Sequence, residues 1–209
     1  MENLTKKYGK LISVILAVLV IGFSVAQIWS ASKTWASFQT NLLPMVIMNL
    51  IACVCLVIGL ISENEKMVKG NLCVFFAITA IGAILTIFNS PVNMPKDNFF
   101  TAVNFVKNGW AFSLHHLFAI FAGFALIIAL FLNVLSKYFQ TEILSKVIGY
   151  LLCLVCLFAI FNFVLTFIAN GMNLYLSVSA QRFDVYHITE DLTLLFSASL
   201  INFVRQINK

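Results

Sequence analysis

The sequence predicts an all-α fold, a polytopic membrane bundle of about six transmembrane helices that forms one domain over residues 1–209. Of its residues, 61% are apolar and only 10% are charged, whereas soluble domains carry about 45–50% apolar and about 25% charged residues. The apolar residues form continuous runs of about 20, the length of a helix that crosses a bilayer core. Transmembrane strands would instead alternate polar and apolar residues. Such runs must be helical because lipid offers the backbone no hydrogen bonds.

Five runs are long enough to span a membrane, and a sixth is shorter and more polar. We expect helices at residues 11–29, 42–61, 71–88, 111–135, 147–169 and 192–204. The first run is longer than the apolar part of a signal peptide, so we interpret it as a retained helix. The sixth follows Thr189-Glu190-Asp191, which resembles a helix start with acids in the first turn. Its polarity leaves three alternatives: it spans, it tilts, or it lies in the interface.

Proline, glycine and asparagine residues agree with these boundaries. Pro44 falls in the first turn of the second helix, where its missing N–H costs nothing. Asn89-Ser90-Pro91 ends the third helix, and Asn170-Gly171 ends the fifth with two residues that tolerate left-handed backbone.

The distribution of basic residues predicts that both chain ends face the cytoplasm in a multi-pass protein of the cell membrane. Cytoplasmic segments carry the excess of Lys and Arg. With the N-terminus inside, the inner segments hold nine basic residues: Lys6, Lys7, Lys10, Lys66, Lys69, Lys137, Lys146, Arg205 and Lys209. The outer segments hold four: Lys33, Lys96, Lys107 and Arg182.

Several function classes find no support in the sequence. The net charge of +5 comes from basic residues at the ends of apolar runs, so we expect no nucleic-acid partner. No nucleotide loop, serine-nucleophile motif or metal-ligand spacing is present, and we expect neither cofactor nor metal. All five cysteines lie inside apolar runs, where a small apolar filler is the simplest role. The expected partners are membrane lipids and a second membrane protein.

His115 and His116 are the candidate catalytic residues, one turn inside the outer end of the fourth helix. Ionisable groups at membrane depth are costly and usually face a bundle interior or a wet cavity. Ala119, Ala122 and Gly123 continue the same helix face, and small residues let helices pack closely. The histidines are therefore interpreted as a proton carrier, general base or metal ligand, or alternatively as interfacial residues hydrogen-bonded to a loop.

A second polar group lies after the fifth helix. Asp184, His187, Glu190 and Asp191 form an expected outer acidic loop on the same side as the two histidines, which is either a ligand site or simply solvated. The candidate ligand-binding residues are Asn162, Asn170, Asn173, Tyr175, Asp184 and His187. Buried amides also link helices by hydrogen bonds, and this structural role is the default interpretation of Asn49, Asn162, Asn170 and Asn173.

The order of features from about Leu42 to Leu176 resembles the bacterial YwaF-type integral membrane proteins. The resemblance rests on Leu43-Pro44, Asn89-Ser90-Pro91, Leu114-His115-His116 and the segment from Asn162 to Leu176. That family is related to an animal membrane protein described as a phospholipid acyltransferase.

This chain departs from the family pattern at one place. Members have His and Cys shortly after the Leu-Pro pair, where this chain has Val46 and Met48. A cysteine nucleophile is therefore missing, unless Cys53 or Cys55 replaces it from deeper in the bilayer. The departure favours binding over catalysis.

Three hypotheses follow from these observations. The first is a YwaF-like protein that binds or acts on a lipid or small hydrophobic ligand from the outer face. The second is a six-helix substrate-binding subunit of a vitamin-type transporter, which would require an energising partner. The third is a structural or assembly protein without a ligand.

Overall fold

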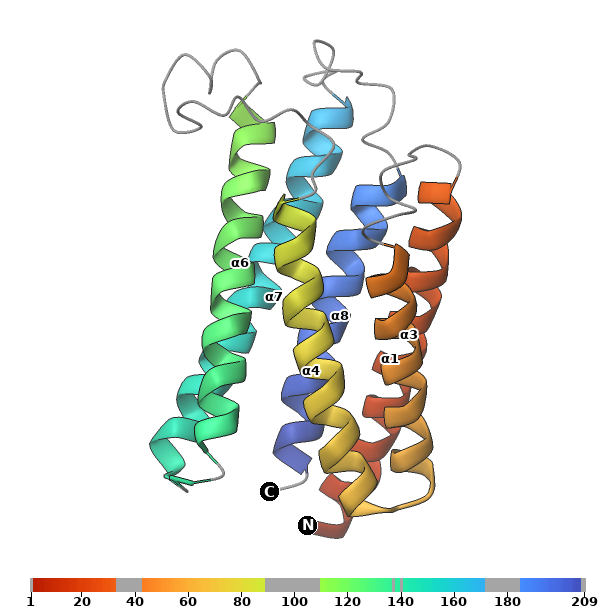
Figure 1. The fold of residues 1–209 in the computed structure, drawn as a ribbon, viewed down its shortest axis with the longest axis vertical. Coiled ribbons are helices and arrows are strands. Elements are labelled where there is room, and N and C mark those ends of the chain that lie inside the picture. Colours follow the sequence, from red (N-terminus) through yellow and green to blue (C-terminus); the bar gives the residue numbers. More distant parts are fainter. Residues whose placement is uncertain are drawn as a thin grey trace.

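The computed structural model describes residues 2–32, 43–88, 110–136, 138–139, 141–171 and 185–207. Within these ranges the secondary structure is entirely helical. The helices are α1 (Glu2–Ser32), α3 (Leu43–Ile61), α4 (Glu65–Phe88), α6 (Trp110–Leu135), α7 (Glu142–Gly171) and α8 (Val185–Ile207). They lie side by side as an up-and-down bundle, with α1 beginning and α8 ending at the same end (Figure 1). We call this the terminal end and the other the distal end.

The predicted fold class is confirmed. Helices α1, α3, α4, α6 and α7 are each long and apolar enough to cross a membrane. The Lys and Arg side chains that the structure describes all belong to the terminal end: Lys10, Lys66, Lys69, Lys146 and Arg205. Basic residues at one end of a bundle are typical of a membrane protein whose charges remain outside the hydrocarbon.

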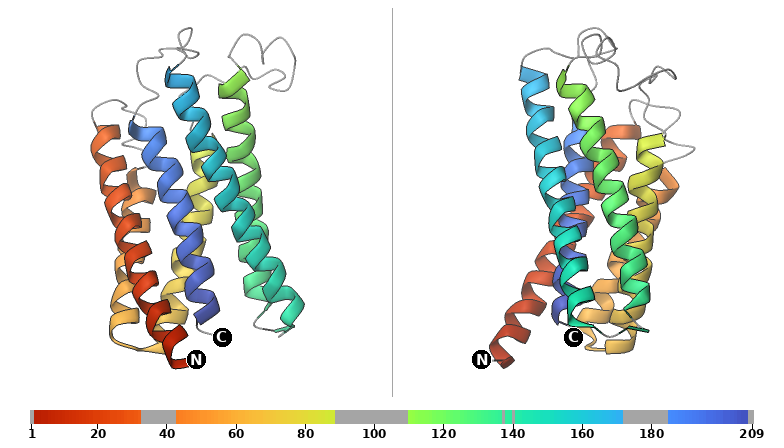
Figure 2. Two further views of the ribbon diagram at one scale, coloured as in Figure 1. Left: turned by 180° about the vertical axis from the view of Figure 1, so that it is seen from behind. Right: turned by 90° about the vertical axis from the view of Figure 1, so that its left-hand side faces the viewer.

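Helix α8 begins seven residues earlier than the start expected at residue 192. It covers Val185–Ile207 and runs the length of the bundle between α1 and α7, with α4 against it on the inner side (Figure 2). Its polar residues are largely buried in protein instead of facing lipid, among them Thr189, Asp191, Thr193 and Ser197. Average hydropathy underestimates the length of such a membrane-spanning helix, because it averages over all faces whereas lipid contacts only one of them.

Three other helices extend beyond their apolar runs at the terminal end. Helix α1 starts at residue 2 instead of 11, α4 at 65 instead of 71, and α7 at 142 instead of 147. Charged first turns remain helical outside the hydrocarbon because i,i+4 ion pairs stabilise them. Lys69 Nζ lies 3.7 Å from Glu65 Oε2, and Lys146 Nζ lies 2.8 Å from Glu142 Oε1.

The helices are held together by close packing and a few interhelical hydrogen bonds. Small buried side chains such as Ala17, Ala122 and Ala129 let neighbouring backbones approach, as in other membrane bundles. Between α3 and α4, Thr79 Oγ1 donates to Asn49 Oδ1 at 3.0 Å, and Asn71 Nδ2 donates to the Cys55 carbonyl at 2.8 Å. Asn49 thus has the helix-linking role expected of the buried amides.

Gly59 marks the closest approach of α3 to α4. A Cβ at this position would lie 3.2 Å from the Val68 backbone nitrogen, whereas one at Gly70 would meet nothing within 4 Å. Gly59→Ala is therefore expected to lose about 1–3 kcal/mol of stability relative to Gly70→Ala, because overpacking against backbone offsets the helix-propensity gain of alanine. Thermal unfolding of both variants in mild detergent measures the difference. Equal melting temperatures would contradict this close contact.

The turn between α3 and α4 is joined to α1 by an ion pair outside the membrane. Lys10 Nζ donates to Glu63 Oε1 at 2.7 Å. This hydrogen bond, with the charge of Lys10, lowers the pKa of Glu63 from its ordinary value of 4.5. A lowered pKa means that the pair stabilises the fold above pH 4.5 and loses this effect as the pH falls below that value.

We therefore expect the melting temperature of the wild type to exceed that of Glu63→Gln at pH 6. The difference should narrow as the pH falls below about 4.5, where the carboxylate becomes protonated. Lys10→Met should behave like Glu63→Gln, since either change removes the pair. A difference that does not depend on pH would mean that the ion pair is not its cause.

Candidate functional site

A buried polar site lies between α7 and α8 near the distal end of the bundle. Asp191 on α8 is only 3% exposed. Thr166 on α7 is fully buried, and its Oγ1 lies 3.4 Å from Asp191 Oδ2 and 3.0 Å from the Asn162 carbonyl oxygen. Asn162, one helical turn before Thr166, lies on the same face of α7 and is 1% exposed. We call Asn162, Thr166 and Asp191 the polar site.

One buried acceptor of the polar site lacks a hydrogen-bond donor. A hydroxyl carries one hydrogen, so Thr166 cannot donate to Asp191 and to the Asn162 carbonyl at the same time. The side-chain oxygen of Asn162, Oδ1, is buried and accepts no hydrogen bond. A buried acceptor without a donor costs about 1–3 kcal/mol, so the site favours a group that brings hydrogens or positive charge.

Two further buried hydroxyls without partners lie deeper in the bundle, toward the terminal end. Ser24 Oγ on α1 and Ser197 Oγ on α8 make no hydrogen bond. Each follows a phenylalanine of the stacked pair Phe23–Phe196, whose ring centroids are 5.5 Å apart, so α1 and α8 present both serines at one height. Ser197 lies six residues after Asp191, about 9 Å along α8. Unpartnered buried polar atoms are rare in proteins, and several in one region are typical of a ligand or water site.

The structure brings the helical candidates to the same end of the bundle. Positions 115 and 116 lie in the second turn of α6, position 170 at the end of α7 and position 187 at the start of α8, all at the distal end (Figure 1). The side chains of His115, His116, Asn170 and His187 lie outside the described residues, as do Asn173, Tyr175 and Asp184 in full. Among the candidates, only Asn162 is described with its side chain.

The small residues that follow the histidines on α6 face protein. Ala122 is fully buried, and Gly123 is buried as well. The packing that the sequence predicted for this face is therefore present below the two histidine positions.

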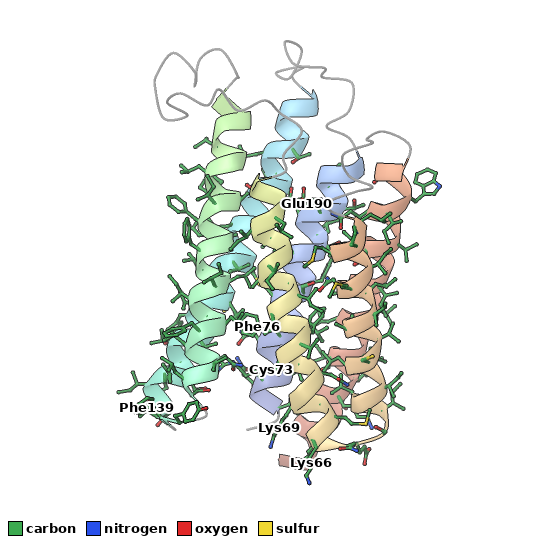
Figure 3. The ribbon with its side chains drawn as sticks, in the orientation of Figure 1. Lys66, Lys69, Cys73, Phe76, Phe139 and Glu190 are labelled. Atoms are coloured by element: carbon green, nitrogen blue, oxygen red, sulfur yellow. The ribbon has the colours of Figure 1, made fainter. Side chains whose placement is uncertain are left out.

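The prediction that Glu190 and Asp191 lie in an outer acidic loop is wrong. Both belong to α8, and Figure 3 shows Glu190 on that helix, at the opposite end of the bundle from Lys66 and Lys69. Asp191 was expected in a loop that forms either a ligand site or a solvated surface, but it lies in the bundle interior. Thr166, Ser24 and Ser197 could not be identified from the sequence, because isolated hydroxyl residues in apolar runs are common and carry no spacing signal.

Of the cysteines, Cys53 is a packing residue of the core, whereas Cys153 is exposed. All five are free thiols. Cys53 is fully buried, and its Sγ lies 3.7 Å from the Ala17 carbonyl oxygen, so α1 covers it. Met48, at the place where the resemblance would require a cysteine, is 48% exposed on the outer surface of α3. Neither position contributes to the polar site.

No metal cluster is evident in the described part of the chain, where no three His, Cys, Asp or Glu side chains are grouped for one ion. Comparison with models of known families, with curated proteins and with solved structures finds no match to this chain. The function must therefore be argued from the polar site itself.

Proposed function

We propose that this protein binds a small hydrophobic or lipid-like ligand through a hydrogen-bond-donating or cationic group that enters the polar site. The observation that carries the proposal is the burial of Asp191 beside Thr166, one turn from the unpartnered Asn162 Oδ1. An ionisable residue inside a membrane bundle is costly and is generally retained for function.

The chemistry of the polar site favours a ligand with an amine or several hydroxyl groups. Its oxygens are mainly acceptors, and the described Lys and Arg side chains all lie at the terminal end. An anionic group would be repelled by the charge of Asp191, whereas an ammonium group would be attracted by it and would give Asn162 Oδ1 a donor. The apolar part of the ligand would remain among the helices or in the surrounding lipid.

The proposal also includes the side of the membrane that the polar site faces and a relation to the YwaF-type proteins. The distal end faces outward if the terminal end, with its basic side chains, is cytoplasmic. Likeness to the YwaF-type proteins supports a lipid-related ligand, and the exposed Met48 supports binding over acyl transfer. His115, His116 and His187 would then contribute from the ends of α6 and α8.

The decisive experiment identifies what the purified protein retains. We expect mass spectrometry of an extract from detergent-purified protein to detect one enriched molecule with an amine or polyhydroxyl group. A water-soluble vitamin, together with a copurifying ATPase, would instead support the transporter subunit. Retention of bulk lipids only, in the ratio of the source membrane, would contradict a specific ligand.

A further inference from the structure

A groove opens on the outer surface of the bundle and shares no lining residue with the polar site. It runs between α1, α7 and α8, on the face where α8 is flanked by the other two helices (Figure 2), and has a volume of about 370 Å³. Its apolar walls are Leu16 of α1, Leu157 and Ile160 of α7 and Phe203 of α8. Leu157 and Ile160 are about half exposed, so the groove opens toward the membrane.

The polar groups in the groove are paired with one another. Cys156 Sγ lies 3.4 Å from Ser199 Oγ, and Asn202 Nδ2 donates weakly to Cys153 Sγ at 3.7 Å. Because these groups satisfy each other across the α7–α8 contact, the groove offers an apolar channel for a hydrocarbon chain.

Arg205 lies at the terminal end of this groove. Its Nη1 donates to Ser145 Oγ at 3.0 Å and its Nη2 to the Ser145 carbonyl at 2.8 Å, while its Nε has no partner. A Cβ added at Gly149 would lie 3.4 Å from Arg205 Nη2 and 3.7 Å from Asn202 Oδ1. The guanidinium of Arg205 and the side chain of the groove-lining Asn202 therefore both pack against Gly149 and lie close to each other.

The charge of Arg205 has no carboxylate partner among the described residues. Lys10, Lys69 and Lys146 each have one, at Glu63, Glu65 and Glu142. Arg205 has instead only the neutral Ser145, which uses two of its five N–H donors; Nε is buried, so one N–H on each of Nη1 and Nη2 remains for a ligand. A guanidinium held in place with donors to spare favours a phosphate, which it binds in a fork geometry.

We propose that Arg205 and this groove form a binding site for an anionic phospholipid. The phosphate accepts hydrogen bonds from the guanidinium at the membrane boundary, and one acyl chain lies along Leu157, Ile160 and Phe203. Basic residues between helices are typical binding sites for anionic headgroups. This site shares no residue with the polar site, so either proposal can fail without the other.

Native mass spectrometry with two competing lipids tests the proposal. The purified protein is mixed with equal amounts of phosphatidylglycerol and phosphatidylcholine, and bound lipid is counted. We expect the wild type to retain phosphatidylglycerol preferentially and Arg205→Gln to lose this preference about tenfold or more, the usual scale for a charge-assisted hydrogen bond. Lys66→Gln, which removes an exposed charge at the same end, should keep the preference.

Two further variants test the groove and separate a loss of lipid binding from a folding defect of Arg205→Gln. Ser199→Leu fills the groove and retains Arg205, so we expect it to lose tightly bound phosphatidylglycerol. Arg205→Lys keeps the charge without the fork and should bind at an intermediate level. Undiminished binding in both Arg205→Gln and Ser199→Leu, equal loss in Lys66→Gln, or a dimer that excludes lipid would overturn the proposal.

Discussion

Asp191→Asn is expected to reduce the amount of copurifying ligand by about 10- to 100-fold. Asparagine keeps the shape of the side chain but removes its charge. A hydrogen bond to a charged group contributes about 1.5–3 kcal/mol, and about 1.4 kcal/mol corresponds to a tenfold change in affinity. Quantitative mass spectrometry of the retained molecule, per mole of folded protein, measures the loss.

The matched control for this variant is Glu142→Gln, which removes an exposed acid at the other end of the bundle. It should leave ligand retention unchanged. Asn162→Ala should weaken retention as well, because it removes the unpartnered acceptor. The polar site is not the binding site if Asp191→Asn and Asn162→Ala both retain the ligand at the wild-type level.

Phe76→Ala is expected to destabilise the bundle by roughly 3 kcal/mol, the lower end of the range for phenylalanine in soluble cores. Phe76 points from α4 into the core and is fully buried (Figure 3). The cost comes mainly from lost packing, because the unfolded chain remains in an apolar solvent and little transfer free energy is lost. Unfolding by increasing fractions of sodium dodecyl sulfate in mixed micelles measures it.

Phe131→Ala on α6 makes the same chemical change on the outer surface. Phe131 is 62% exposed, so detergent or lipid fills the space that it leaves. We expect a loss well below 1 kcal/mol for this variant, within the usual range for surface substitutions. Similar losses in the two variants would mean that Phe76 does not pack in the core as described.

The limits of sequence reasoning are clearest for α8. Its expected start at residue 192 came from hydropathy, which averages over all faces of a helix, whereas the helix begins at Val185. Asp191 and Thr193 are tolerated because α7, α1 and α4 shield them from lipid, and no local pattern reveals that shielding. Asn162 was identified because an amide inside a long apolar run stands out, whereas Thr166 did not.

The sequence alone determined the class of the protein: a membrane bundle, the approximate position of each helix, and the end at which the described basic side chains lie. These properties depend on the transfer of short segments into lipid, which is additive along the chain. Only the tertiary structure decided which face of α8 is interior, that Asp191, Thr166 and Asn162 meet, and that Arg205 lies beside an apolar groove. Those relations join residues tens of positions apart, and they follow from how the helices pack against one another.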